Sequence, residues 1–168
     1  MDSQISLRYV AFVFDKETQV IAGQGTFNLL AVEDLFRAVA TGAPAAQFGI
    51  AFSEGSDNRT LRTTGNDQSL AARAAQLIRE LNAGHFFIVL LRGAYPIQVL
   101  NNIKALSTTV NVQVASGNAI NAIVADLSDI SSVLGFTDGS APGEIEGTGD
   151  RKSRRALVRR IGYLEPED

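Results

Sequence analysis

The alternation of apolar and polar positions predicts strands and helices that interleave along the chain. Residues 7–14 are rich in β-forming side chains, and a turn at 15–17 leads to a second strand. Residues 47–53 and 60–64 flank a polar turn at 55–58, which predicts a hairpin. Further strands are expected at 110–115, 119–125 and 132–136.

The run at 86–91 differs from these segments because it contains no polar residue. A short, fully apolar run is typical of a central strand that is covered on both faces. We therefore expect residues 86–91 to form the core strand of the sheet.

Helices are predicted between the strands. One begins near Val32 and ends just past Thr41, where Gly42 and Pro44 follow. Either Asn66 or Asp67 caps a second helix, whose apolar stripe consists of Leu70, Ala74, Leu77, Ile78 and Leu81. A third helix begins at Pro96, and a basic helix is expected at 150–160. This order predicts a layered α/β domain, with a mixed β-sheet and flanking helices, that spans residues 1–168.

Composition agrees with one compact domain and excludes several kinds of site. The chain has 168 residues, 45% of them hydrophobic, and no cysteine, which removes disulfides, thiolate nucleophiles and cysteine-ligated metals. The first residues lack the pattern of a secretory signal, and no apolar run is long enough to cross a membrane. A cytoplasmic location is therefore expected.

The charge distribution is uneven. The net charge is −3, yet residues 151–160 include six of the fifteen basic side chains. This segment is either a solvated helix face or a contact with phosphate or with a neighbouring subunit's acids. Nucleic acid is not an expected partner, because the rest of the chain has nine basic against eighteen acidic side chains.

Familiar catalytic and phosphate-binding motifs are absent. There is no P-loop and no Gly-x-Ser-x-Gly elbow, and residues 23–28 lack the last glycine of a dinucleotide fingerprint. With one histidine and no cysteine, a transition-metal site is not supported, although Glu54, Asp67 or Asp138 could bind magnesium. Asp138 and Gly139 also form an ordinary turn signal.

His85 is the only histidine, and it stands directly before the predicted core strand. A neutral imidazole can act near neutral pH as a base or as a nucleophile toward phosphorus. The preceding Gly84 would let a phosphate or a neighbouring backbone approach. The alternative is that His85 only closes the turn between helix and strand.

Four polar residues follow at places where they could reach a cleft. Arg92 and Lys104 suit phosphate oxygens, and Asn101 and Asn118 could bind a ribose or an adenine edge. Asn101 and Lys104 are three residues apart and share a helix face. Each also has a structural interpretation, as a strand-end charge, a surface lysine, a cap or a turn residue.

A series of ordered segments links these residues. They are FGIAF at 48–52, GND at 65–67, AGH at 83–85, LRGAYPI at 91–97, VLNNIK at 99–104, VLG at 133–135 followed by Asp138 and Gly139, and RIGY at 160–163. In these segments, from about residue 20 to 163, the chain resembles the adenosine-specific kinase family.

The resemblance implies an α/β fold, a homotrimer and binding of adenosine or of ATP, ADP or AMP. It also implies a histidine that can carry phosphate, a role that falls to His85. Nucleotide contacts would come from Gly84, Arg92, Asn101, Lys104, Asn118, Asp138 and Gly139, with a further polar site at Glu54, Asn66 and Asp67.

One segment departs from the family pattern. Many relatives carry a histidine and a lysine in the segment that matches residues 23–29, where this chain has Thr26 and Leu29. Two hypotheses follow: phosphoryl transfer from an ATP-type donor to adenosine or a related nucleoside, with magnesium, or binding of adenosine nucleotides without turnover.

Overall fold

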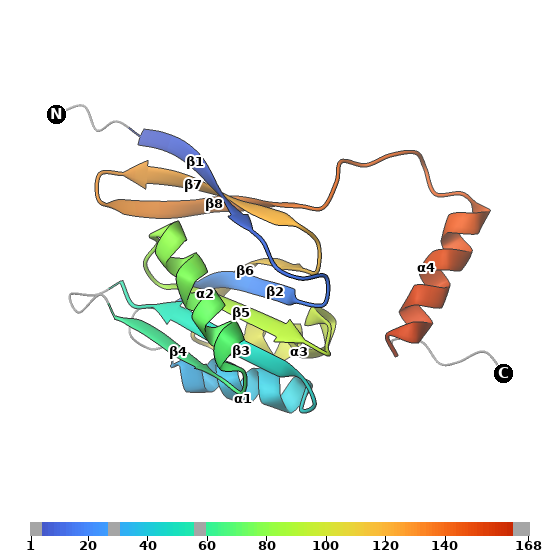
Figure 1. Ribbon diagram of the computed structural model, residues 1–168, viewed down its shortest axis with the longest axis horizontal. Coiled ribbons are helices and arrows are strands. Elements are labelled where there is room, and N and C mark those ends of the chain that lie inside the picture. Colours follow the sequence, from blue (N-terminus) through green and yellow to red (C-terminus); the bar gives the residue numbers. More distant parts are fainter. Residues whose placement is uncertain (1–4, 27–30, 56–59, 163–168) are drawn as a thin grey trace.

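The strands lie in two sheets in a computed structural model of the protein, which describes residues 5–26, 31–55 and 60–162 (Figure 1). The strands are β1 (Ile5–Phe12), β2 (Gln19–Gly25), β3 (Gln47–Ser53), β4 (Leu61–Gly65), β5 (Phe86–Arg92), β6 (Thr109–Ser116), β7 (Ile120–Leu127) and β8 (Ile130–Asp138). The helices are α1 (Val32–Gly42), α2 (Gln68–Leu81), α3 (Pro96–Lys104) and α4 (Thr148–Arg160).

The predicted α/β class with flanking helices is confirmed, and the structure refines the sheet. Five strands pair in the order β4-β3-β5-β2-β6, and three pair in the order β1-β7-β8. All pairings between these strands are antiparallel. Strand β5 runs opposite to both of its neighbours, β2 and β3, so the central sheet is antiparallel rather than mixed. The predicted hairpin is the pair β3–β4, although most of its turn lies outside the described residues.

Strand β5 is the buried centre that the apolar run predicted. Phe86, Ile88 and Leu90 face one core cluster, and Phe87, Val89 and Leu91 face the other. The first cluster is closed by α2 and the three-stranded sheet, and the second by α1 and α3. Because side chains alternate across a strand, burial of both faces requires apolar residues at every position.

Helix α2 buries the stripe of five residues that its spacing predicted. Its N-cap is Asp67, whose carboxylate accepts the backbone N–H groups of Ser69 at 2.8 Å and Leu70 at 3.0 Å. The hydrogen bonds from Ser69 and Leu70 hold the pKa of Asp67 below its ordinary value. Asn66 instead ties the start of β3 to this turn, because its side chain accepts from the Phe48 N–H at 2.7 Å.

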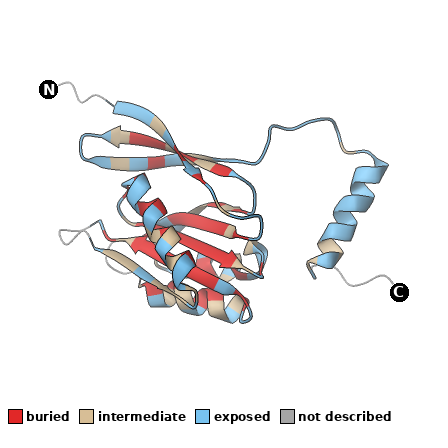
Figure 2. Cartoon of the chain, viewed as in Figure 1, coloured by how far each residue is buried: buried red, intermediate tan, exposed pale blue. Residues whose placement is uncertain are grey.

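The last helix stands apart from the sheets. No residue of α4 is buried, and the residues between β8 and α4 are almost entirely exposed (Figure 2). The predicted basic helix is thus confirmed, but as an arm rather than as part of a layer. Across the described part of the chain, no helix combines the length and apolarity that a membrane span requires.

Gly49 sets how closely α2 approaches the sheet. A Cβ atom at this position would lie 2.0 Å from the backbone nitrogen of Ala71 and 2.3 Å from the carbonyl carbon of Leu70. Both atoms belong to the helix backbone, so no rotamer change can relieve the clash. Contact between helix and strand therefore depends on the absence of a side chain at Gly49.

We expect Gly49→Ala to lower the free energy of unfolding by about 1 to 3 kcal/mol or more, the usual cost of overpacking a core. Urea unfolding followed by circular dichroism measures this change. Gly135→Ala is the matched control, because a Cβ atom there meets nothing within 4 Å. Equal stability of the two variants would show that α2 can shift without cost.

Candidate functional site

His85 occupies a strained backbone position between α2 and β5. Its φ is 53°, in the left-handed region that few non-glycine residues adopt, with asparagine, aspartate and histidine the most frequent of them. Asn82, the C-cap of α2, has a φ of 55°. The carbonyl oxygen of His85 accepts the Gly25 N–H at 2.8 Å, which ties the turn to the end of β2. Left-handed non-glycine residues persist only where the surrounding structure holds them, and they are found often at functional sites.

The imidazole of half-buried His85 lies directly over the backbone of Gly55. A Cβ atom on Gly55 would lie 2.8 Å from Cε1, 2.9 Å from Nδ1 and 3.1 Å from Nε2 of the ring. A Cβ atom on Gly84 would in turn lie 3.1 Å from the Cα atom of Gly55. The missing side chain of Gly55 therefore leaves the space that the ring occupies, and the missing side chain of Gly84 lets its backbone approach Gly55.

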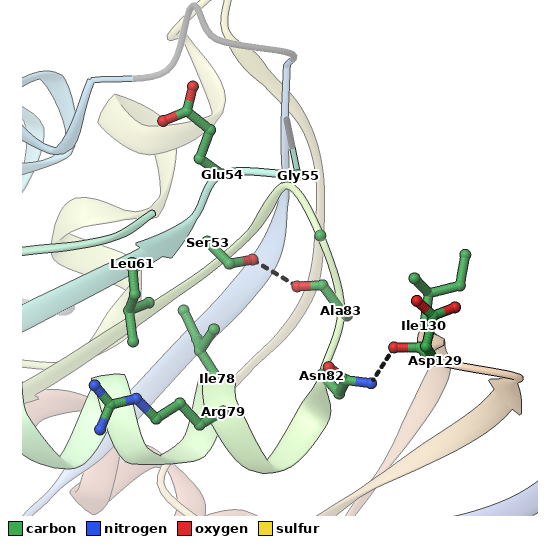
Figure 3. Close-up of a pocket in the computed structure, with 11 residues that line it drawn as sticks. Ser53, Glu54, Gly55, Leu61, Ile78, Arg79, Asn82, Ala83, Asp129 and Ile130 are labelled. Carbon is green, nitrogen blue, oxygen red and sulfur yellow. Dashed lines mark hydrogen bonds between the residues drawn. The ribbon is translucent and has the colours of Figure 1, made fainter. Parts of the chain in front are cut away.

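A cavity of about 560 Å³ opens next to this turn (Figure 3). Its walls come from the end of β3, the end of α2 and the β7–β8 turn. The lining residues are Ser53, Glu54, Gly55, Leu61, Ile78, Arg79, Asn82, Ala83, Gly84, Asp129 and Ile130. His85 is not itself a lining residue, but two of its neighbours are: Gly84, which precedes it, and Gly55, which lies against its ring. The volume is in the range of small-ligand pockets.

Hydrogen bonds join the walls of the cavity. The Ser53 hydroxyl donates to the Ala83 carbonyl oxygen at 2.5 Å, and the Asn82 amide donates to the Asp129 carbonyl oxygen at 3.1 Å (Figure 3). Glu54 is largely buried and forms an ion pair with Arg62 of β4. The cavity thus combines a fixed backbone frame with carboxylate and guanidinium groups.

Arg92 lies at the other end of β5, engaged with the β1–β2 turn. Its Nε donates to the hydroxyl of Thr18 at 3.0 Å and its terminal nitrogen to the carboxylate of Asp15 at 2.5 Å. The Thr18 hydroxyl donates to the same carboxylate at 2.8 Å. The hydrogen bond from Thr18, together with Arg92, lowers the pKa of Asp15. A smaller cavity of about 300 Å³ adjoins this edge, lined by Lys16, Glu17, Gln19, Gly93, Ala94 and Tyr95.

Asn118 and Asp138 form a second polar group at the Arg92 end of the sheet. The Asp138 carboxylate accepts from the Ser116 hydroxyl at 2.6 Å and from the Asn118 amide at 2.9 Å. Gly139, with a φ of 66°, follows at a position where a Cβ atom would lie 3.1 Å from the Asn118 amide nitrogen. Ser116 pairs with Val20 of β2, which itself pairs with Leu90 near the end of β5.

The candidate residues therefore divide between two edges of the central sheet. Glu54, Gly84 and His85 lie where β5 begins, and Arg92 lies where it ends. Strand β5 has seven residues, so the two edges are about 20 Å apart at roughly 3.3 Å per residue. The Arg92 edge also includes Asn66, Asp67, Asn118, Asp138 and Gly139. Asn101 and Lys104 are exposed residues of α3, and neither lines the cavity at the start of β5. Asn102 between them donates to the Ala38 carbonyl oxygen at 3.1 Å.

Comparison with known proteins identifies the family. The family model "Adenosine specific kinase" matches residues 10–164. The chain belongs to this family. A solved structure, the PH1918 protein from Pyrococcus horikoshii OT3, is 38% identical with a TM-score of 0.88, and the match covers 97% of this chain and all of that one. No curated protein matches the chain.

The three candidate magnesium ligands of this adenosine specific kinase family member do not lie together in the described part of the chain. Over 5–26, 31–55 and 60–162, no group of three or more histidine, aspartate or glutamate side chains is placed to hold a metal ion. Glu54 pairs with Arg62, Asp67 caps α2, and Asp138 accepts two hydrogen bonds. The three carboxylates therefore do not form a magnesium cage of their own.

Of the two residues that depart from the family pattern, the structure describes one. Thr26 follows β2, and its N–H donates to the Thr108 carbonyl oxygen at 2.8 Å, close to the His85 turn. Leu29 lies outside the described residues. Of the eleven residues that line the cavity, only Glu54 and Gly84 were predicted as site residues from the sequence. The nine that were missed include the polar residues Arg79, Asn82 and Asp129 and the glycine under the imidazole, Gly55. The sequence assigned Gly55 only to a turn. Asn82 could have been recognised, because it directly follows a predicted helix and asparagine is frequent at left-handed helix C-caps.

Gly55→Ala should displace the imidazole of His85, because the added methyl group would occupy the place of the ring. Since the chain has one histidine, its ring protons give a single set of NMR signals. We expect these signals to shift in Gly55→Ala and to stay in place in Gly135→Ala, where a Cβ atom has open space. Unchanged signals in Gly55→Ala would mean that the ring does not rest on this glycine.

Proposed function

We propose that the protein is an adenosine nucleotide-binding phosphotransferase in which His85 is the phosphoacceptor or the base. The observation that supports this most is the placement of the chain's one imidazole, held at a positive φ beside the 560 Å³ cavity. Membership of the adenosine specific kinase family supports the substrate class. Residues in sparsely populated backbone regions cluster at active sites and ligand-binding sites.

His85 would act through one of its ring nitrogens. As phosphoacceptor, the nitrogen lone pair attacks the γ-phosphorus of an ATP-type donor, and the bond to the bridging oxygen breaks so that ADP leaves. The phosphoryl group then passes to an acceptor hydroxyl, whose proton is released. As base, the ring instead takes the proton of that hydroxyl during direct transfer. Magnesium would be held mainly by the phosphate oxygens, with Glu54 the candidate carboxylate in the cavity wall.

The residues at the opposite edge remain part of the proposal as nucleotide contacts. Arg92, Asn118 and Asp138 lie too far from His85 of the same subunit to bind the same phosphate. They would therefore bind either a second ligand or a nucleotide that also meets His85 of a neighbouring subunit. The second arrangement would be consistent with the homotrimer that the family resemblance implies. A cytoplasmic location is proposed separately, from the absence of cysteine and of a secretory pattern in the sequence.

A second candidate function is binding of adenosine nucleotides without turnover. The observation that favours it is the segment 23–29, where many relatives carry a histidine and a lysine and this chain has Thr26 and Leu29. Measurement of product formation separates the two, since a binding module saturates with nucleotide but releases no product.

We expect adenosine, AMP or ADP to raise the midpoint of thermal unfolding, and the guanosine analogues to leave it unchanged. A ligand that binds only the folded state at 100 times its Kd stabilises it by about 2.7 kcal/mol. Differential scanning fluorimetry over a ligand series measures the shift. Equal shifts with both purines would refute the adenosine preference while leaving nucleotide binding intact.

Incubation with ATP labelled at the γ-phosphate, together with magnesium, should leave acid-labile and base-stable label on the protein. His85→Asn should abolish this label, because asparagine cannot act as the nucleophile. It should also stay folded, because asparagine tolerates a positive φ. If the wild type forms product but carries no label, and His85→Asn forms no product, His85 is assigned as a base. Wild-type transfer by folded His85→Asn would exclude both roles.

A further inference from the structure

The three-stranded sheet has an apolar face that points away from the core. Val10 and Phe12 of β1 are buried, whereas Leu7 and Tyr9 alternate with them and point outward. Large exposed side chains continue this face across all three strands, with 39% to 69% of their surface accessible: Ile5, Leu7, Tyr9, Leu127 and Leu134. Several large apolar side chains exposed on one face of a sheet are typical of an interaction surface.

Helix α4 is a second surface that is little covered by the rest of the described chain. It has 13 residues, none of them buried, and a helix of this length is marginally stable alone in water. Leu157, 43% exposed, and Ile161 are four residues apart and so share one side. The segment that joins α4 to β8 is mostly exposed, and Figure 1 shows α4 standing beside the sheets rather than on them.

The two surfaces match in size. A helix of 13 residues is about 20 Å long and 10 to 12 Å wide. Strands of eight or nine residues are about 26 to 30 Å long, and three paired strands are about 10 to 14 Å wide. One α4 helix can therefore cover the outward face of one three-stranded sheet, which is the usual way in which an open sheet face is closed.

The charges point to a second copy of the chain as the partner. Helix α4 includes six basic residues and one acidic residue, Asp150, which leaves nine basic and seventeen acidic side chains in the rest of the chain. A second copy thus presents the apolar face together with an acidic body, to which a basic helix is attracted. The long basic side chains can lie along apolar surface with their charged ends in water.

We propose that α4 of one copy packs on the outward face of the β1–β7–β8 sheet of another copy. Leu157 and Ile161 contact Leu7, Tyr9 and Leu134, and residues 139–147 form the connection between the two bodies. The exchange of a terminal element between identical chains is a common route to oligomers. This inference concerns assembly and does not depend on which reaction His85 performs.

Cross-linking tests the contact, because the native chain has no cysteine. Ser132→Cys places a thiol on the exposed face of β8, and Ser153→Cys places one on α4, one turn before Leu157. Mixed and oxidised, the two variants should form a disulfide-linked pair, which mass spectrometry of the joined peptides identifies. Val110→Cys, on the other sheet and 55% exposed, replaces Ser132→Cys in the control mixture and should give at least tenfold less.

The oligomeric mass provides a second test. The wild type should exceed the 17.9 kDa of one chain in sedimentation at micromolar concentration, and Leu7→Glu should reduce that mass. Val110→Glu, of similar exposure, should not. The proposal would be overturned by a monomeric wild type or by equal cross-linking in the control mixture. It would also be overturned if a double variant, Ser132→Cys with Ser153→Cys, formed its disulfide within one chain while the mixed single variants formed none. If Leu7→Glu does not fold, the cross-linking result decides.

Discussion

Burial of β5 on both faces is the constraint on which the arrangement of the other elements depends. A strand with apolar side chains on each side needs two separate covers, and the chain supplies α1 and α3 for one face and α2 with the three-stranded sheet for the other. Full burial of each large apolar side chain contributes about 1.5 to 3 kcal/mol, so six such residues favour this arrangement strongly. The two ends of the strand remain accessible, and both groups of candidate residues lie there.

Most of the element order could be predicted from the sequence because the signals are local. The unbroken apolar run identified β5, and the five-residue stripe with Asp67 before it identified α2 and its cap. Division of the strands into two sheets could not be predicted, because periodicity shows which face of a strand is apolar but not which strand lies beside it. The detachment of α4 was also beyond the sequence, since a basic amphipathic pattern is the same for a packed and an unpacked helix.

The candidate site shows the same division between local and long-range information. His85 was singled out because it is the only imidazole and precedes the core strand, both of which can be read from the sequence. Its positive φ and the closeness of Gly55 depend on how the β3 end meets the α2–β5 turn, and residues 55 and 85 are far apart in the chain. The distance between His85 and Arg92 follows from the strand that joins them, and it makes a common phosphate contact within one subunit impossible.

The strand order also constrains how the chain can fold. Strands β2 and β3 follow one another in sequence but are not neighbours in the sheet, because β5 lies between them. The edges of β2 and β3 that pair with β5 stay open until residues 86–92 have left the ribosome. Strand β6 joins the other edge of β2 later still. Non-local pairing of this kind slows folding, and it leaves unpaired, aggregation-prone strands on the incomplete chain. During synthesis, the half-made protein is therefore the form that most needs protection by chaperones.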